Sequence, residues 1–168
     1  MRNRKWIFGL IGLLGVVIMA LSLLGHKTVY TEIEIPASPS EVWKILTDAA
    51  RYSEWNPVII AVEGEYGPGE TLSNTVRETS GKESLMKSKV IGWKPEQELN
   101  QFGGLRGILT FDHKWQLAPI PEGTQVIQRE EYRGVGVWFW DASWVEPAYA
   151  RANQALKERV LSLRQASE

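Results

Sequence analysis

The alternation of apolar and polar positions predicts strands along most of the chain. In residues 26–35, Val29, Thr31, Ile33 and Ile35 fall on one face and polar residues on the other, which is typical of a half-buried strand. Further strands are predicted at residues 58–65, 71–78, 85–93, 98–102, 108–118 and 125–133, with turns rich in glycine, proline or serine between them. Short strands joined by such turns predict an antiparallel meander.

A helical period replaces this alternation in two segments. Ser38 is placed as an N-cap, with Pro39 in the first turn and Glu41 completing a capping box. Apolar residues follow at helical spacing (Val42, Ile45, Leu46 and Ala49), and a second short helix is expected over residues 49–55. Near the end, residues 147–164 carry one apolar stripe, made of Tyr149, Ala152, Leu156, Val160 and Leu163. This stripe predicts a long amphipathic helix.

The order of these elements predicts an α+β fold. A strand, two short helices, a run of strands and a long helix suit a seven-stranded curved antiparallel sheet wrapped around the C-terminal helix. That helix is the only element able to cover the concave face of the sheet. A sheet bent around a helix tends to leave a gap, and gaps lined with apolar side chains hold ligands. We therefore expect a ligand-binding domain over residues 27–165.

A charge-free apolar run precedes this domain. Residues 6–24 read WIFGLIGLLGVVIMALSLL, which as a helix would be about 28 Å long, close to the thickness of a bilayer core. We expect residues 1–25 to hold a single transmembrane anchor, with Trp6, Leu10, Leu13, Val17, Leu21 and Leu24 among its apolar residues. Basic residues precede the run, which predicts a cytoplasmic N-terminus and a domain outside the cytoplasm. The alternative is a signal peptide cleaved near Ala20, and hence a secreted domain.

Composition and charge exclude several kinds of function. The chain has 19 Lys and Arg against 20 Asp and Glu, and three of the basic residues precede the apolar run, so the domain carries a net negative charge. We therefore expect it not to bind nucleic acid, which requires a basic face. It has no cysteine, which excludes disulfides, thiolate metal ligands and cysteine nucleophiles. Its two histidines, His26 and His113, belong to no metal-binding motif. We expect neither a metal nor a cofactor.

The last predicted hairpin holds the candidate chemistry. Its turn at Pro121 and Glu122 pairs position 117 with 126 and position 115 with 128, which makes His113 and Glu130 cross-strand neighbours on the concave side. A histidine and a carboxylate in an apolar cavity could act as a general acid–base pair. They could equally pair with each other, or with other groups, as buried polar residues that only stabilise the fold.

The expected cavity lining comes from several predicted elements. We assign to it Trp55, Leu109, Phe111, His113, Trp115, Gln128, Glu130, Tyr132, Trp138, Tyr149 and Leu156. Trp138 belongs to an aromatic stretch that also includes Trp140 and Trp144. These tryptophans could line the cavity mouth, lie at a membrane interface, or fill the core where a strand meets a helix.

Four stretches resemble a known family. Residues 35–57 (IPASPSEVWKILTDAARYSEWNP), 63–72 (EGEYGPGETL) and 107–134 (GILTFDHKWQLAPIPEGTQVIQREEYRG), with the final helix at Asn153, Leu156 and Lys157, are similar to the polyketide cyclase/dehydrase and lipid-transport family. This family belongs to the START-like superfamily, often labelled SRPBCC. The resemblance covers about residues 28–164 and implies a helix-grip fold with a hydrophobic pocket. The family shares no common catalytic set, so it implies no catalytic residue here.

Three functions remain open from the sequence. We expect a membrane-tethered module that binds or transfers a lipid or other hydrophobic small molecule without catalysis. The alternative is a cyclase or dehydratase that uses His113 and Glu130, and a third reading is a partner-binding domain without a ligand. Polar groups deep in the pocket would favour the enzyme, and polar groups confined to the mouth would favour the binder.

Overall fold

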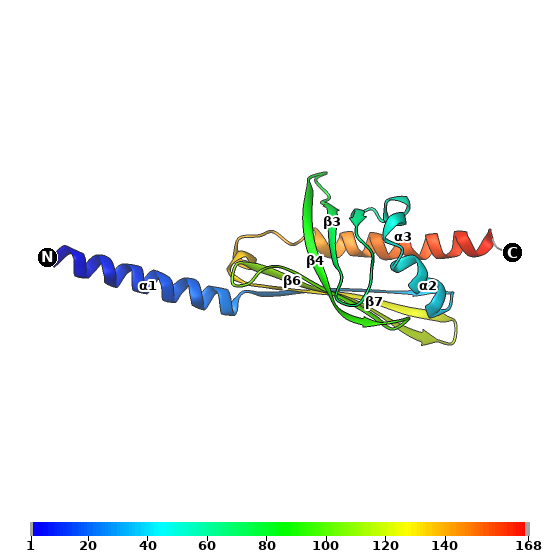
Figure 1. Cartoon of the computed structure of the whole chain (residues 1–168), viewed down its shortest axis with the longest axis horizontal. Helices are drawn as coiled ribbons and strands as arrows, with labels where there is room; N and C mark the ends of the chain where they lie inside the picture. Colours follow the sequence, from blue (N-terminus) through cyan, green and yellow to red (C-terminus); the bar gives the residue numbers. More distant parts are fainter. Residues whose placement is uncertain (1, 167–168) are drawn as a thin grey trace.

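A seven-stranded antiparallel sheet curves around the C-terminal helix α3 (Val145–Gln165) in the computed structural model, which describes residues 2–166 apart from the side chains of residues 2–5 and 7 (Figure 1). The strand order is β1-β7-β6-β5-β4-β3-β2. The strands are β1 (His26–Ile35), β2 (Ile59–Glu63), β3 (Thr71–Arg77), β4 (Glu83–Lys94), β5 (Glu98–Leu105), β6 (Leu109–Ile120) and β7 (Gly123–Arg133). This confirms the predicted α+β helix-grip arrangement.

The register of the last hairpin is as predicted. Leu117 lies opposite Val126, and His113 lies opposite Glu130. The short turn between β6 and β7 leaves little freedom for slippage, because a slip by one residue would turn the apolar face to solvent. The hairpin therefore places His113 and Glu130 on the concave face, where both side chains are buried.

The helices after β1 begin where the sequence predicts. Helix α2 (Pro39–Leu46) is capped by Ser38, whose hydroxyl accepts from the Glu41 N–H while the Glu41 carboxylate accepts from the Ser38 N–H. This reciprocal pair satisfies two backbone donors at the helix start. The short helix η1 (Ala49–Glu54) follows, and a second short helix, η2 (Val135–Trp138), connects β7 to α3.

Helix α3 covers the concave face with most of its predicted stripe. Tyr149, Ala152, Leu156 and Val160 are buried, and the last two belong to a dense apolar cluster with residues of α2, β1 and β3–β7. Leu163 is 37% exposed, so its assignment to the inward stripe is wrong. The final turns of α3 carry Ser162, Leu163 and Arg164 on the surface.

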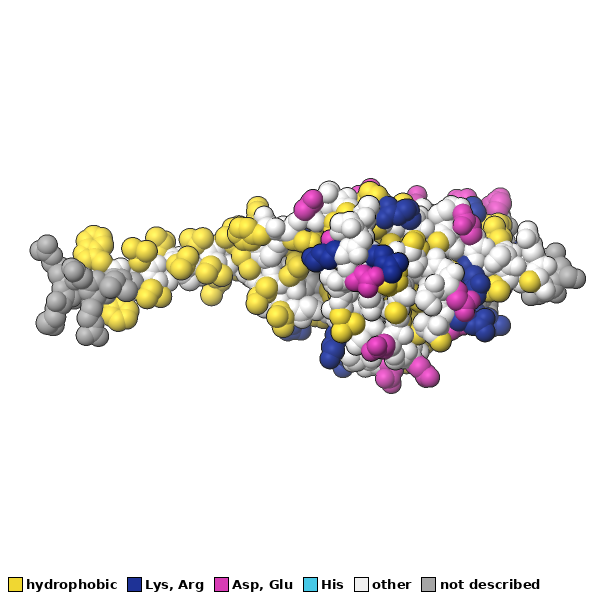
Figure 2. Space-filling model, turned by 90° about the horizontal axis from the view of Figure 1, so that it is seen from above, with side chains coloured by type: hydrophobic (Ala, Val, Ile, Leu, Met, Phe, Trp, Pro, Cys, Tyr) yellow, Lys and Arg dark blue, Asp and Glu magenta, His cyan; other side chains and the backbone are white. Residues whose placement is uncertain are grey.

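Helix α1 (Arg2–Leu24) leads away from the domain, and Figure 2 shows it as a narrow rod of hydrophobic side chains. The apolar residues Trp6, Leu10, Leu13, Val17 and Leu24 are exposed, whereas Leu21 is half-buried beside η2. The basic side chains of Arg2, Arg4 and Lys5, on which the predicted orientation depended, lie outside the described part.

The expectation of a transmembrane anchor is wrong. A membrane crossing requires about 20 consecutive, predominantly apolar residues. Among the described residues, no helix combines the length and the hydropathy that a crossing requires. The predicted single-pass topology, with its extracytoplasmic domain, is overturned with it.

Candidate ligand cavity

A cavity of about 820 Å³ lies between the concave sheet and the first half of α3. Its apolar lining comes from β2 to β6, from the β5–β6 turn and from the segment before α3: Val58, Ile59, Val76, Leu85, Met86, Phe102, Leu105, Ile108, Leu109, Phe111, Trp140 and Trp144. This volume lies within the range of pockets that enclose a small organic ligand.

Small and polar residues at inward positions of the sheet leave this space unfilled. Asn74, Ser88 and Gly103 occupy inward positions on β3, β4 and β5 and line the cavity. Gly103 also lies directly under Phe111, and a Cβ at this glycine would come within 2.4 Å of the Phe111 ring. The Phe111 ring therefore occupies its place only because residue 103 lacks a side chain.

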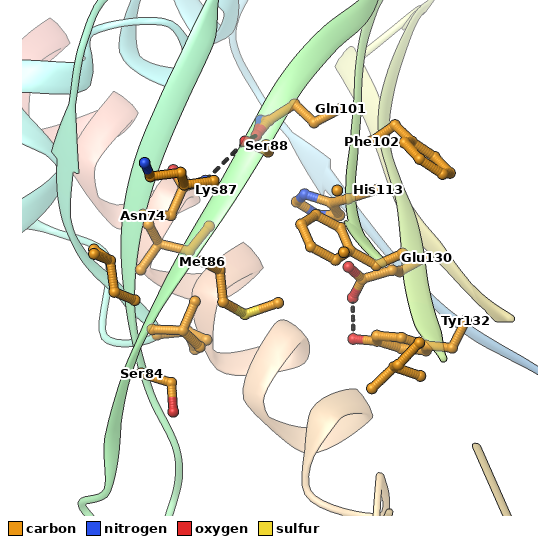
Figure 3. A pocket seen from close by; sticks show the side chains of 18 of the residues that line it. Asn74, Ser84, Met86, Lys87, Ser88, Gln101, Phe102, His113, Glu130 and Tyr132 are labelled. Carbon is orange, nitrogen blue, oxygen red and sulfur yellow. Dashed lines mark hydrogen bonds between the residues drawn. The ribbon is translucent and has the colours of Figure 1, made fainter. Parts of the chain in front are cut away.

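Polar side chains from three adjacent strands form a hydrogen-bonded row on the cavity wall. The Asn74 amide donates to the Ser88 hydroxyl over 2.9 Å, and this hydroxyl donates to the Gln101 side-chain oxygen over 2.9 Å (Figure 3). All three side chains are buried. Asn74 Oδ1 has no hydrogen-bond partner in the part of the chain that the structure describes, so the row presents an unpaired acceptor next to the cavity.

Glu130 lines the other side of the cavity, facing β3 and β4 (Figure 3). The hydroxyls of Tyr132 and Tyr149 both donate to Glu130 Oε2, one from the same strand and one from α3. Burial raises the pKa of the Glu130 carboxyl to about 7, although the two tyrosine hydrogen bonds act in the opposite direction. Near neutral pH this carboxyl is therefore present in both its protonated and its ionised form.

His113 has a separate hydrogen-bond partner. The Gln128 amide donates to His113 Nε2 over 2.9 Å, which leaves the ring proton on Nδ1. Burial lowers the pKa of His113 to about 4, so the ring is neutral at pH 7. Among the described residues, no hydrogen bond joins His113 to Glu130, although the two lie opposite each other.

The residues assigned to the cavity from sequence fall into three groups. Those that line it are Leu109, Phe111, His113, Glu130, Tyr132 and Tyr149. Those buried away from it are Trp115 and Leu156, in the dense apolar cluster, and Gln128, behind His113. Trp55 borders a separate shallow pocket, and Trp138 is 55% exposed and donates to the Leu21 carbonyl.

Sequence reasoning missed the polar row. Asn74, Ser88 and Gln101 lie on strands whose alternation was clear, so their facing could have been assigned. The sequence contained this information, because Asn74 lies two residues from both Leu72 and Val76, and these apolar residues mark its face as the inward one.

A curved antiparallel sheet with a long helix across it and a cavity between them defines the class of helix-grip domains. The sequence profile of the family described as "Polyketide cyclase / dehydrase and lipid transport" matches residues 26–161. The chain belongs to this family. No curated protein matches the sequence significantly.

Solved structures share the fold at low sequence identity. A protein from Rhodobacter sphaeroides is 18% identical, with a TM-score of 0.67 and coverage of 81% of this chain and 93% of that one. The Zhui aromatase/cyclase from Streptomyces sp. R1128 is 15% identical, with a TM-score of 0.65 and coverage of 80% and 93%. The di-domain ARO/CYC protein BexL is also 15% identical, with a TM-score of 0.67, and the match covers 92% of this chain but 59% of BexL.

Proposed function

We propose that this domain binds a hydrophobic small molecule in the cavity between the sheet and α3. The observation that carries the proposal is the space of about 820 Å³, open to solvent at its mouth, with a largely apolar wall. An apolar cavity of this size leaves the packing between sheet and helix incomplete, and a ligand that filled it would restore the missing contacts. Membership in a family described by polyketide and lipid ligands supports the same class of molecule.

A neutral fluorescent probe tests this proposal. N-phenyl-1-naphthylamine brightens when it leaves water, and we expect a saturable increase at one probe per chain. Val76 lines the cavity on β3, and Val76→Trp fills part of the space. This variant should bind the probe at least about tenfold more weakly, since a bulky side chain and the probe compete for one volume.

The matched control places the same side chain outside the cavity. Ile91 lies on β4, is exposed and does not line the cavity. Ile91→Trp should bind the probe as the parent does. Equal affinities of the parent and both variants would show that the probe binds elsewhere and would refute the proposed site.

Acid–base catalysis is the second candidate, and the depth of the polar groups favours it. Glu130, with a pKa of about 7, could give or take a proton near neutral pH, and the neutral His113 lies on the adjacent strand. A cyclase or dehydratase needs such groups beside an apolar substrate. The polar row of Asn74, Ser88 and Gln101 could hold carbonyl oxygens or hydroxyls of that substrate.

A short poly-β-ketone thioester distinguishes catalysis from binding alone. If the domain is a cyclase, cyclised or dehydrated products should accumulate faster with the protein than without it, as measured by mass spectrometry. Glu130→Gln should then abolish the acceleration while the neutral probe still binds, because the change removes proton transfer and keeps the apolar contacts. Product formation equal to the uncatalysed rate would leave the binding function alone.

A further inference from the structure

The cavity contains unpaired hydrogen-bond acceptors on two facing walls. Tyr132 and Tyr149 both donate to Glu130 Oε2, and Oε1 has no hydrogen-bond partner among the described residues. On the facing wall, Asn74 Oδ1 is also without a partner. Figure 3 shows Asn74 and Glu130 on opposite sides of the same space. A ligand that pairs with these atoms must supply hydrogen-bond donors, because an amide oxygen and a carboxylate oxygen both accept.

The charge around Glu130 also favours a cation. Its neighbours are Tyr132 on β7, Tyr149 on α3, the neutral His113 on β6 and the apolar Val29 on β1. The charge of the acidic Asp112 also raises the Glu130 pKa. No arginine or lysine forms an ion pair with Glu130 in the described part of the chain. The carboxylate therefore lacks a counter-ion among the described side chains.

Aromatic rings continue from this carboxyl toward the start of α3. The Tyr132 and Trp140 rings lie edge to face with their centroids 4.6 Å apart, and the Trp140 and Trp144 rings do so with their centroids 6.5 Å apart. All three side chains line the cavity. Aromatic faces attract cations through their quadrupole, most strongly for tryptophan and where water is excluded.

The lysines that line the cavity lie away from this acidic end. Lys82, Lys87 and Lys89 are exposed residues of β4 and the turn before it, and Lys82 is paired with Glu78 at 3.4 Å. They remain in contact with solvent, which screens their charge. They therefore do not neutralise the buried carboxylate across the cavity.

We propose that the cavity selects apolar ligands that carry a basic amine, whose ammonium group pairs with the Glu130 carboxylate beside Tyr132, Trp140 and Trp144. The inference rests on the ligand-binding function proposed above and specifies its ligand class. Above pH 7, where Glu130 is mostly ionised, ligands of the same shape with a carboxylate are disfavoured, because two negative charges would share a site without a counter-ion.

Three probes with one aromatic frame test this selection. They are 1-naphthylmethylamine, 1-naphthalenemethanol and 1-naphthoate, titrated against the full chain by calorimetry at pH 8. The amine should bind at least about tenfold more tightly than the alcohol, through the ion pair and the aromatic contacts, and the carboxylate should bind most weakly.

The pH dependence of amine binding provides a second test, because the fit of a ligand's shape to the cavity would not change with pH. Between pH 6 and 8 the amine remains an ammonium ion while Glu130 ionises, and His113 stays neutral throughout. Amine affinity should therefore rise by about tenfold over this range, while alcohol affinity stays constant. This comparison uses the unmodified protein, so it does not depend on how any variant folds.

Matched variants assign the effect to one carboxyl. Glu130→Gln should remove the preference for the amine over the alcohol and its pH dependence. Glu131→Gln changes the neighbouring residue, which forms ion pairs with Arg129 and Arg133 on the outer face, and should leave both unchanged. Equal binding of amine and alcohol, or tighter binding of the carboxylate, would overturn the inference and leave the binding function standing. Absence of binding by all three probes would overturn both.

Discussion

Helix α3 crosses two regions of the sheet that differ in packing. Its second half, with Leu156 and Val160, lies in a dense apolar cluster around Trp115. Its first half, with Tyr149, faces the cavity and the buried carboxyl of Glu130. The same helix and the same strands therefore form a closed half and an open half of one interface.

The difference in packing arises because inward residues two positions apart on the same strand differ in character. Inward positions carry a large apolar residue in the closed half and a polar one in the open half: Leu72 and Asn74 on β3, Val90 and Ser88 on β4, Leu99 and Gln101 on β5, Trp115 and His113 on β6. Since residues two apart share a face, each strand contributes to both halves. The closed half thus holds the sheet and helix together, and the open half is free to carry a ligand site.

The largest expected contrast comes from placing a charge in each half. Leu156→Asp buries a carboxyl in the closed half, where Leu156 is fully buried, and should cost about 3–5 kcal/mol of unfolding free energy. Leu109→Asp places the same group on the cavity wall, where space allows hydration, and should cost about 1–2 kcal/mol. Urea unfolding measures both, and equal losses would show that the halves do not differ in packing.

The second contrast concerns pH, because two titratable groups of the open half, Glu130 and His113, have large shifts in opposite directions. Burial raises the Glu130 pKa from 4.5 to about 7, so the folded state keeps a proton that the unfolded state releases, and stability falls as pH rises through this range. Burial lowers the His113 pKa from 6.5 to about 4, so the unfolded state binds the extra proton, and stability falls as pH drops through this range. The two effects offset each other between pH 4.5 and 6.5.

Single substitutions should separate the two contributions to the pH dependence of stability. As pH rises from 4.5 to 7, the stability of Glu130→Gln should increase by about 3 kcal/mol relative to that of the parent. As pH rises from 4 to 6.5, the stability of His113→Gln should decrease by about 3 kcal/mol relative to that of the parent. Trp115→Phe, in the closed half, should lower stability by the same amount at every pH. Thermal unfolding across pH 4–8 measures all three, and parallel curves for Glu130→Gln and the parent would contradict the proton assignment.

A smaller effect is expected from the polar row. Ser88→Ala removes the acceptor of Asn74 and the donor of Gln101, and should cost about 1–3 kcal/mol because both groups stay buried. Ser162→Ala removes a hydroxyl that bonds the Arg159 carbonyl on the surface of α3, and should change stability by less than about 0.5 kcal/mol. A negligible loss for Ser88→Ala would mean that water replaces the row without cost.

The smallest effect should come from trimming a side chain that faces the cavity. Met86→Ala enlarges a space that already exists and should cost less than about 1 kcal/mol, whereas Leu99→Ala creates a new void in the closed half and should cost about 2–5 kcal/mol. Denaturant midpoints compare the two. A cost for Met86→Ala as large as that for Leu99→Ala would indicate that the open half is as tightly filled as the closed one.

The sequence predicts the fold well where local pattern decides it. The capping box at Ser38 and Glu41 and the hairpin register between Leu117 and Val126 both follow from short-range chemistry, and both are confirmed. The end of the inward stripe was placed too late, because helical periodicity does not show where the sheet stops beneath α3. Leu163 is exposed for this reason.

The candidate site depends on contacts that strand alternation alone does not give. Facing and register place His113 opposite Glu130, but their actual partners are Gln128 for the first and Tyr132 and Tyr149 for the second. Tyr149 comes from α3, and the rotation of a helix over a sheet depends on the packing of the whole interface. The apolar run at residues 6–24 shows a different limit, since its composition predicted a crossing that the described helix does not support.

The position of β1 has a consequence for how the protein is made. In the described sheet this edge strand pairs with β7 alone, its His26 lying opposite Arg133, so its partner is synthesised about 100 residues later. At about 5–20 residues per second, β1 waits roughly 5–20 seconds on the ribosome before its hydrogen bonds can form. Such long-range pairing slows folding and exposes unpaired strand edges. We expect the nascent chain to depend on chaperones until β7 emerges, and the final hairpin to be the step that completes the sheet.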